Sequence, residues 1–218
     1  MTTPTRSLGG VSARARVEHR RRRLLDAALD VVGERGVADF TMTAVCRSAN
    51  LTERYFYESF ARREDVLTAL FDEVAANALD HAVAAADAAA PAGLERRAGA
   101  AIGAVVRLLA EDPRSARLYR EAVGHPGLAA RRRDTVTAFA AFLAGLVADE
   151  HPALRGRDDL VVDTVVLTGG IVEAVGAWLD GRLPVAQDAL VVRCTRLVVA
   201  AARQPAPEHP STASAPRE

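Results

Sequence analysis

The stretch FTMTAVCRSANLTERYFYESF, residues 40–60, carries the signals for two short helices joined by a tight turn. Thr41 precedes the first helical pattern, where its hydroxyl can accept a hydrogen bond from a first-turn N–H group. Asn50 stands where that helix must end, and asparagine tolerates a positive φ better than other residues except glycine. Thr52 then caps a second short helix. Two helices with a tight joint predict a helix-turn-helix.

The second short helix carries three consecutive aromatic residues and a fourth just after them, although only 5% of the chain is aromatic. At about 100° per residue, Phe56 and Phe60 share one face, so we assign these two rings to the core. Burying every ring would require the helix to be covered all round, which its polar, arginine-bearing sequence disfavours. Arg54, Tyr55 and Tyr57 are therefore expected to face outward.

An outward arginine and two tyrosines suit a helix that enters the major groove of DNA. Arginine pairs with two acceptors of guanine, and tyrosine hydroxyls reach phosphates or base edges. Thr43 and Thr52 lie near helix N-termini, where they can contact phosphates together with backbone N–H groups. Such residues could equally be ordinary surface, and Glu53 and Glu58 count against a polyanion, but the combination of caps, turn and outward side chains favours DNA. The predicted DNA-facing residues are Thr41, Thr43, Thr52, Arg54, Tyr55, Tyr57 and Arg63.

The charge distribution points the same way. The net charge of the chain is zero, and every basic residue is arginine because the sequence contains no lysine. Residues 1–63 hold twelve arginines against seven acidic residues, whereas the remainder holds sixteen against twenty-one. This polarity predicts an N-terminal surface that meets a polyanion and a remainder that does not.

Helical periodicity continues along the chain, and no strand-like alternation interrupts it, so we expect an all-α fold. The sequence is 50% hydrophobic and 26% charged, as in a globular protein. Residues 1–15 read as a flexible basic arm and residues 204–218 as a disordered tail. Glycine, proline and asparagine separate the expected helices, which cover about 17–35, 64–89, 94–110, 112–123, 128–149, 158–179 and 185–203.

Residues 24–71 resemble the N-terminal domain of TetR-family transcriptional regulators. An alanine-rich first helix ends at Gly36, and Tyr57 and Phe60 stand at the Tyr-x-x-Phe spacing of the family. The chain departs from the family pattern at three positions, all physically tolerable. These departures are Cys46 for alanine, Asn50 for glycine and Arg63 for lysine.

The resemblance implies a ligand-responsive regulator, with repression as the commoner outcome, that binds a palindromic double-stranded DNA operator as a homodimer. An N-terminal three-helix helix-turn-helix DNA-binding domain would precede a C-terminal helical ligand-binding and dimerisation domain. The resemblance also places Arg63 on the DNA backbone. It further places the last two helices in a four-helix bundle with the same helices of the twofold-related chain. Both helices are apolar on more than one face, as burial against a domain and a partner requires. The predicted segments are a basic arm at 1–15, the helix-turn-helix domain at 16–63, the C-terminal domain at 64–203 and a tail at 204–218.

The resemblance also implies an effector pocket within the C-terminal helices, whose occupation changes the spacing of the two DNA-binding domains. Rings and one carboxylate interrupt otherwise Ala- and Val-rich helices there, although core packing explains the rings equally well. The candidate lining residues for an unidentified small-molecule effector are Tyr119, Phe139, Phe142, Glu173 and Trp178.

Two other function classes remain as alternatives. For an enzyme, the five histidines are scattered without metal or triad spacing and no glycine-rich phosphate loop occurs, so we expect no catalysis, no metal and no cofactor. An all-α binding or adaptor protein without sequence-specific DNA binding is disfavoured by the outward Arg and Tyr set. Cys46 and Cys194 lack paired spacing, which fits the cytoplasm. No targeting signal and no charge-free apolar run of membrane length occurs, so no membrane contact is expected.

Overall fold

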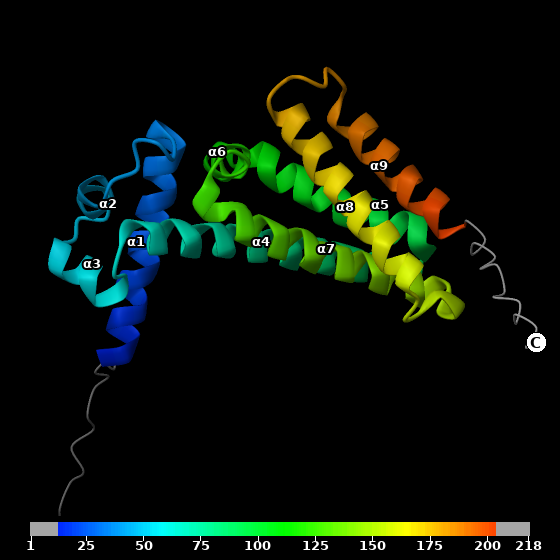
Figure 1. Cartoon of the computed structure of the whole chain (residues 1–218), viewed down its shortest axis with the longest axis horizontal. Helices are drawn as coiled ribbons and strands as arrows, with labels where there is room; N and C mark the ends of the chain where they lie inside the picture. The colour runs from blue at the N-terminus through cyan, green and yellow to red at the C-terminus, as the bar shows by residue number, and fades with distance from the viewer. Residues whose placement is uncertain (1–12, 204–218) are drawn as a thin grey trace, which may run out of the picture.

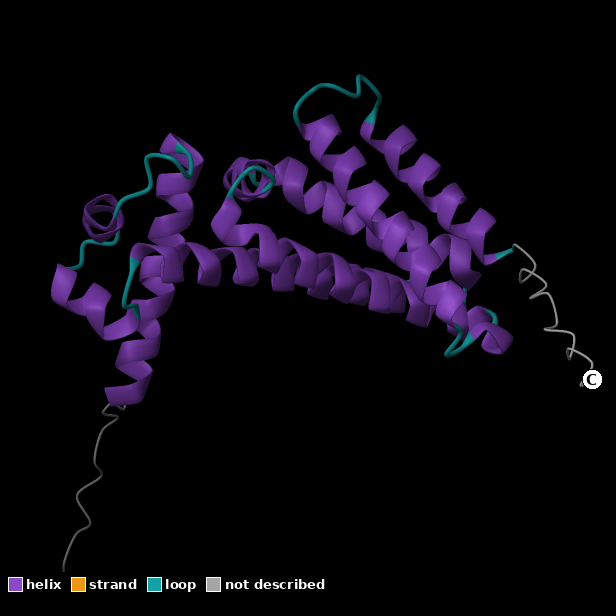
Figure 2. Cartoon of the chain, in the orientation of Figure 1, coloured by secondary structure: helices purple, strands orange, loops and turns teal. Residues whose placement is uncertain are grey.

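The computed structural model describes residues 13–203, and within this range every regular element is a helix (Figure 2). The expected all-α class is confirmed. The α-helices are α1 (Ala13–Arg35), α2 (Met42–Ser48), α3 (Glu53–Ser59), α4 (Arg63–Ala88), α5 (Gly93–Glu111), α6 (Pro113–Ala122), α7 (Ala129–Glu150), α8 (Asp158–Leu179) and α9 (Gln187–Ala202), and two 3₁₀ helices, η1 (Pro126–Leu128) and η2 (Pro152–Leu154), flank α7.

The helices form two domains that share α4 (Figure 1). In the N-terminal domain, α2 and α3 pack on the outer side of α1, and α4 leads away from them into the second domain. There α4 packs against α5 and α7, α5 packs against α9, and α7 packs against α8. Helix α6 contacts α1 as well as α5 and α8, so it joins the two domains.

Gly and Asn end the helices of the N-terminal domain where the sequence predicts. Gly36 adopts a φ of +85° just after α1, and its N–H donates to the Val32 carbonyl at 2.8 Å. Asn50 adopts a φ of +50° in the turn between α2 and α3. Both prediction and structure follow from the lower cost of the left-handed conformation for these two residue types.

The core of the N-terminal domain forms around the apolar face of α1. Phe40 and Phe56 are among its largest fully buried side chains, and they pack with Leu24 of α1 and Val66 of α4. Leu118 of α6 belongs to the same core. This core therefore runs across the boundary predicted at residue 63, and the domain limits themselves stay a prediction.

Three local expectations need correction. Helix α1 begins at Ala13, inside the segment expected to be an arm and before the expected start near Val17, because nothing in ARAR breaks a helix. The gaps expected after residues 123 and 149 each contain a single 3₁₀ turn, η1 and η2 respectively. Each turn starts with proline, whose fixed φ favours the first position of a turn. The rest of the predicted arm, residues 1–12, and the predicted tail, residues 204–218, lie outside the described residues.

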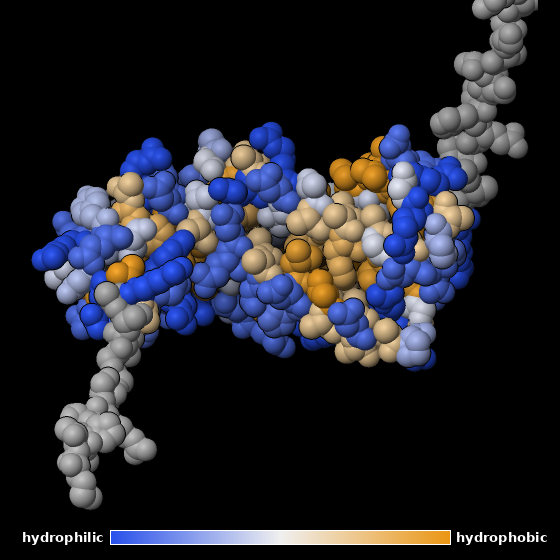
Figure 3. Space-filling model, turned by 90° about the horizontal axis from the view of Figure 1, so that it is seen from below, coloured by the Kyte–Doolittle hydropathy of each residue, from blue (hydrophilic) through white to orange (hydrophobic). Residues whose placement is uncertain are grey.

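The outer faces of α8 and α9 carry apolar side chains that are exposed in the single chain. Val162 and Val166 of α8 are 61% and 67% exposed, and Leu197 of α9 is 46% exposed. Figure 3 shows apolar residues gathered over the C-terminal domain on the face seen from below, whereas the N-terminal domain is mostly hydrophilic there. By length and composition alone, α8 is the one helix within residues 13–203 that could cross a membrane, and 22% of its most apolar window is buried.

A substitution at Phe56 tests how the inward side of α3 packs against the rest of the domain. Replacing its fully buried ring with alanine should lower the free energy of unfolding by about 3–5 kcal/mol, because the ring leaves a cavity between α1 and α3. Tyr57→Ala, on the same helix but 59% exposed, is the matched control and should cost less than about 1 kcal/mol. Urea unfolding of both variants measures the difference, and equal losses would contradict this packing.

Candidate DNA-binding surface and ligand cavity

Helix α3 presents one buried and one exposed side. Phe56 is 0% exposed and Phe60 only 6%, so these rings fix the helix to the domain. Tyr57 is 59% exposed, and the Arg54 side chain is 85% exposed. The structure thus brings the outward residues together on one surface as the sequence predicts, and their contact with DNA stays a prediction.

Arg20 of α1 contacts the outward side of α3. The Arg20 guanidinium lies over the Tyr55 ring at 4.6 Å from its centroid, and it also donates to Glu58 at 3.0 Å. Arg54 lies 3.4 Å from the other Glu58 oxygen. Glu58, whose charge by itself counts against a polyanion, therefore sits between two cations. Nothing in the local sequence of α3 signals Arg20, because the contact joins residues 38 positions apart.

The two threonine caps behave differently. The Thr41 hydroxyl accepts a hydrogen bond from the Ala44 N–H at 3.2 Å, as expected. Thr52 occupies the cap position of α3 with an extended backbone, but its side chain makes no capping hydrogen bond, so this part of the expectation is wrong. Thr52 and Thr43 are both exposed, so their hydroxyls can reach a partner.

Arg63 begins α4 and contacts the protein itself. Its guanidinium donates to the Phe40 carbonyl and to the Glu64 carboxylate, both at 2.8 Å. The pKa of Glu64 is lowered, first by this hydrogen bond from Arg63. Arg63 thereby fixes the start of α4 to the segment that leads into α2, and its predicted phosphate contact stays a prediction.

A carboxylate on α6 joins the C-terminal domain to the end of α1. Glu121 accepts a hydrogen bond from the Val37 backbone N–H at 2.6 Å and another from Arg117 at 2.7 Å. Arg117 also donates to the Gly33 carbonyl at 3.2 Å. Burial alone would raise the pKa of Glu121, but the hydrogen bonds from Arg117 and Val37 outweigh it, and the pKa lies below its usual value.

A second polar link lies two turns earlier on α6. Arg114 donates to Asp30 of α1 at 2.6 Å and to Asp112 at 3.1 Å. Asp112 also caps α6 by accepting from the Arg114 N–H, with Pro113 at the first helical position, as the sequence predicts. The pKa of Arg114 is raised, first by its hydrogen bond to Asp30 and then by that to Asp112. With Glu121, this link fixes the position of α6 against α1.

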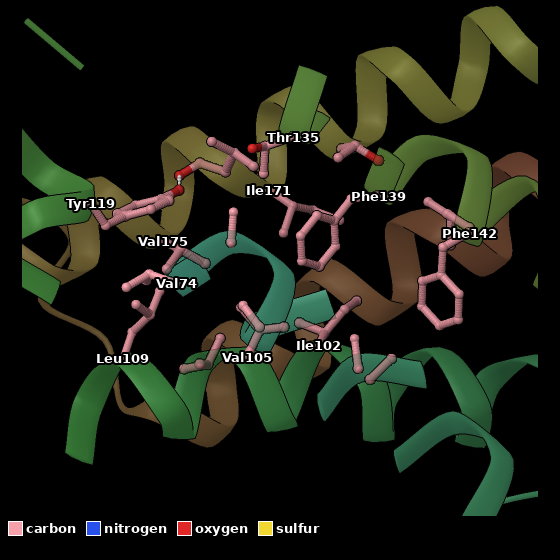
Figure 4. A pocket seen from close by; sticks show the side chains of 18 of the residues that line it. Val74, Ile102, Val105, Leu109, Tyr119, Thr135, Phe139, Phe142, Ile171 and Val175 are labelled. Atoms are coloured by element: carbon pink, nitrogen blue, oxygen red, sulfur yellow. Dashed lines mark hydrogen bonds between the residues drawn. The ribbon is translucent and has the colours of Figure 1, made fainter. Parts of the chain in front are cut away.

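A cavity of about 130 Å³ lies inside the C-terminal domain (Figure 4). Helices α4, α5, α6, α7 and α8 supply its walls, and apart from Tyr119, Thr135 and Thr168 every lining residue is apolar. Tyr119 lies at one end and Phe142 at the other, with Phe139 between them. These three predicted residues therefore line one cavity, and their contact with an effector stays a prediction.

Two of the predicted effector residues lie away from the cavity wall. Glu173 faces outward, with 64% of its side chain exposed, and forms an ion pair with Arg132 at 3.0 Å. Trp178 lies near the C-terminal end of α8 and packs with a cluster that includes residues of α9. Its indole N–H donates to the Val185 carbonyl at 3.0 Å. The prediction failed here because it rested on residue type alone. Helical phase places both side chains away from the cavity, whereas their neighbours Val172 and Val175 line it.

Tyr119 links the cavity to α8. Its hydroxyl donates to the Val172 carbonyl at 2.6 Å. Burial raises the pKa of Tyr119, and the nearby Glu173 carboxylate raises it further while Arg132 opposes this. The phenol is therefore neutral and already hydrogen-bonded, and its oxygen can still accept a further hydrogen bond.

Comparison with known proteins agrees with this architecture. Residues 24–70 match the family model described as bacterial regulatory proteins, tetR family. This N-terminal segment of the chain is therefore similar to the tetR family of bacterial regulatory proteins. Over 71 residues it is 37% identical to the HTH-type transcriptional regulator BetI of Rhizobium meliloti (strain 1021), a match that covers 33% of this chain and about a third (35%) of that relative.

Solved structures share this fold over most of the chain. The fatty acid degradation regulator FadR from Bacillus halodurans superposes with a TM-score of 0.68 at 21% identity, covering 82% of this chain and 97% of that one. The transcriptional regulator FadR from Bacillus subtilis, solved in complex with stearoyl-CoA, has a TM-score of 0.68 at 20% identity and covers 83% and 98%. At these identities the likeness establishes the fold of both domains.

The junction between α1 and α6 should weaken in acid. Because the folded-state pKa of Glu121 is lowered, its contribution to stability is fully present above the unfolded carboxyl pKa of about 4.3 and disappears as pH falls through the lowered value. Glu121→Gln should lower the free energy of unfolding by about 1–2 kcal/mol at pH 7. Urea unfolding from pH 7 to pH 3 should show this difference shrinking below about pH 4; a constant difference would contradict the assigned role of the charge.

Proposed function

We propose that this chain is a ligand-responsive transcriptional regulator of the cytoplasm. It binds a palindromic DNA operator as a homodimer, acts as a repressor and is released by a small-molecule effector. The observation that carries the proposal is the surface of α3, where Arg54 and Tyr57 are exposed above two rings that anchor the helix. The family match covers the same residues.

The surface of α3 has the chemistry of a recognition helix. Arg54 can donate to two acceptors of one guanine in the major groove. Tyr55 and Tyr57 offer hydroxyls, and Thr43 and Thr52 lie beside the helix N-termini that favour phosphate. The ion pair of Arg20 with Glu58 reduces the repulsion between α3 and a phosphate backbone. Because α1 holds α3 through stacking and hydrogen bonds, little ordering is needed on binding.

The apolar face of α8 and α9 supports homodimer formation. Exposed valines follow one another along α8 at helical spacing, and a lone chain gains nothing by exposing them. A Cβ added at Gly169 or Gly170 of the same helix would meet no neighbouring segment within 4 Å, so a second helix has room to approach closely there. A twofold pair of α8 and α9 would bury these residues in a four-helix bundle. Two recognition helices about 34–36 Å apart would then meet successive turns of a palindrome.

The cavity supports a small-molecule effector. FadR of Bacillus subtilis, which shares the fold, was solved with stearoyl-CoA. In this chain, Leu118 of α6 lines the cavity and is also buried in the core of the N-terminal domain. An occupant that displaces α6 would therefore act on α1 through Glu121 and Arg114. If the occupied state holds the two DNA-binding domains at another spacing, the effector shifts the population away from DNA.

The recognition surface is tested by the double variant Arg54→Ala with Tyr57→Ala. Specific affinity for the DNA that flanks its own gene should fall by about tenfold or more, because base-edge contacts of about 1–3 kcal/mol are lost. Arg96→Ala, an exposed arginine of α5, is the matched control and should bind normally. Fluorescence anisotropy measures both. Unchanged specific affinity in the double variant would favour the alternative of an all-α binding or adaptor protein.

The dimer is tested by Val166→Arg on the exposed face of α8. A charge placed in an apolar interface is costly, so the variant should be monomeric at concentrations where the unmodified chain is a dimer. Val123→Arg, at a valine that is 49% exposed after α6, is the matched control and should stay dimeric. Sedimentation velocity distinguishes the two states. A dimeric Val166→Arg variant would remove this face from the interface.

A further inference from the structure

The cavity wall restricts the chemistry of the molecule that it can hold. None of its lining residues carries a charge. Of its three polar side chains, all uncharged, the Tyr119 hydroxyl donates to the Val172 carbonyl and the Thr135 hydroxyl donates to the Arg131 carbonyl at 2.9 Å, and the third is Thr168. An ion enclosed by these walls would lose its hydration without a counter-charge, which is strongly unfavourable. The body of the occupant must therefore be apolar.

A pair of opposite charges lies beside the end of this cavity where Tyr119 stands. Arg132 is one helical turn before Thr135 on α7, and Glu173 follows Val172 on α8. Their side chains meet at 3.0 Å, and both act electrostatically on the Tyr119 hydroxyl, which lies at that end of the cavity. Arg132 is the more enclosed partner, since 24% of its side chain is exposed against 64% for Glu173.

The pair can be opened by a ligand that brings its own carboxylate. The hydrogen bond to Glu173 uses one of five N–H donors of the Arg132 guanidinium, and a planar carboxylate can accept two in parallel. Glu173 would return to water at little cost, because its side chain is already mostly exposed. A cationic head could pair only with Glu173, and because 64% of that side chain is exposed, the pair would contribute little. An uncharged head would gain nothing from replacing Glu173.

We propose that the cavity binds an unbranched aliphatic carboxylate, whose chain runs from Tyr119 toward Phe142 and whose head binds Arg132 in place of Glu173. This rests on the proposed role of the cavity as the effector site. The chain length contributes to affinity, because each methylene buried from water favours binding by about fourfold. Arg132 selects the head group.

Calorimetric titration of the full-length chain with decanoate, 1-decanol and decyltrimethylammonium tests the proposal. Decanoate should bind most tightly of the three, and Arg132→Ala should weaken it by about tenfold or more, as expected for loss of a charge-assisted pair. Arg133→Ala, its exposed neighbour on α7, is the matched control and should change the affinity less than about twofold. Glu173→Gln should strengthen decanoate binding, because the competing carboxylate is gone.

Several outcomes would overturn the proposal. These are absence of decanoate binding, binding of 1-decanol or the cation as tight as that of decanoate, or equal effects of the Arg132 and Arg133 substitutions. A thermal melt checks that Arg132→Ala is folded, and Arg132→Lys, which retains the charge, should recover part of the decanoate affinity even if the alanine variant is unstable.

The same titrations separate this inference from the proposed function. They need no DNA, so Arg132-dependent decanoate binding by a chain that fails to bind its operator would uphold the inference and remove the regulator. Operator release by another compound, without decanoate binding, would do the reverse.

Discussion

The position of Leu118 on α6 is the constraint on which the two domains depend. Its side chain is fully buried in the core that α1 and α4 form around Phe56, and it also lines the cavity of the C-terminal domain. Packed interiors have few voids, so a side chain shared in this way cannot move for one domain alone. The next residue, Tyr119, faces α8. The N-terminal domain and the cavity therefore share one wall.

Polar contacts fix the position of α6 relative to α1. Apolar packing holds α6 against α1 but pairs no defined polar atoms, because dispersion contacts are non-directional. Glu121 and Arg114 add that pairing, since each is hydrogen-bonded to a defined atom of α1 or of the turn after it, at 2.6 Å. Charge-assisted hydrogen bonds of this length depend steeply on geometry. A displacement of α6 must therefore carry α1 with it or break these bonds.

The sequence predicts the parts of this structure that are encoded locally. Gly36, Asn50 and Pro113 act through their own backbone preferences, so helix ends could be placed from them alone. The division of α3 into inward Phe56 and outward Tyr57 follows equally from helical phase. Before α1, where no such residue stands, the expected start near Val17 lies inside the helix that begins at Ala13.

Contacts between distant segments leave no such signal. Glu121 and the Val37 N–H are 84 residues apart, and neither residue type is unusual where it stands. For the same reason a carboxylate in an apolar helix suggested Glu173 as a cavity residue, whereas the partner that decides its position is Arg132 on a different helix. Residue type indicates that a charge needs a partner, and only the fold shows which one.

Helix α8 contributes both to the cavity and to the exposed apolar face. Its inner side supplies Ile171 and Val175 to the cavity wall, while its outer side exposes Val162 and Val166. Because its apolar surface is so broad, the helix is also long and apolar enough, by length and composition alone, to span a membrane. With a partner chain on its outer side, α8 would lie between the ligand and the second protomer. Under the proposed function, a ligand that shifts α8 relative to α6 would then alter the geometry of the dimer and the orientation of α1 together. These two quantities would set the distance between the proposed recognition helices.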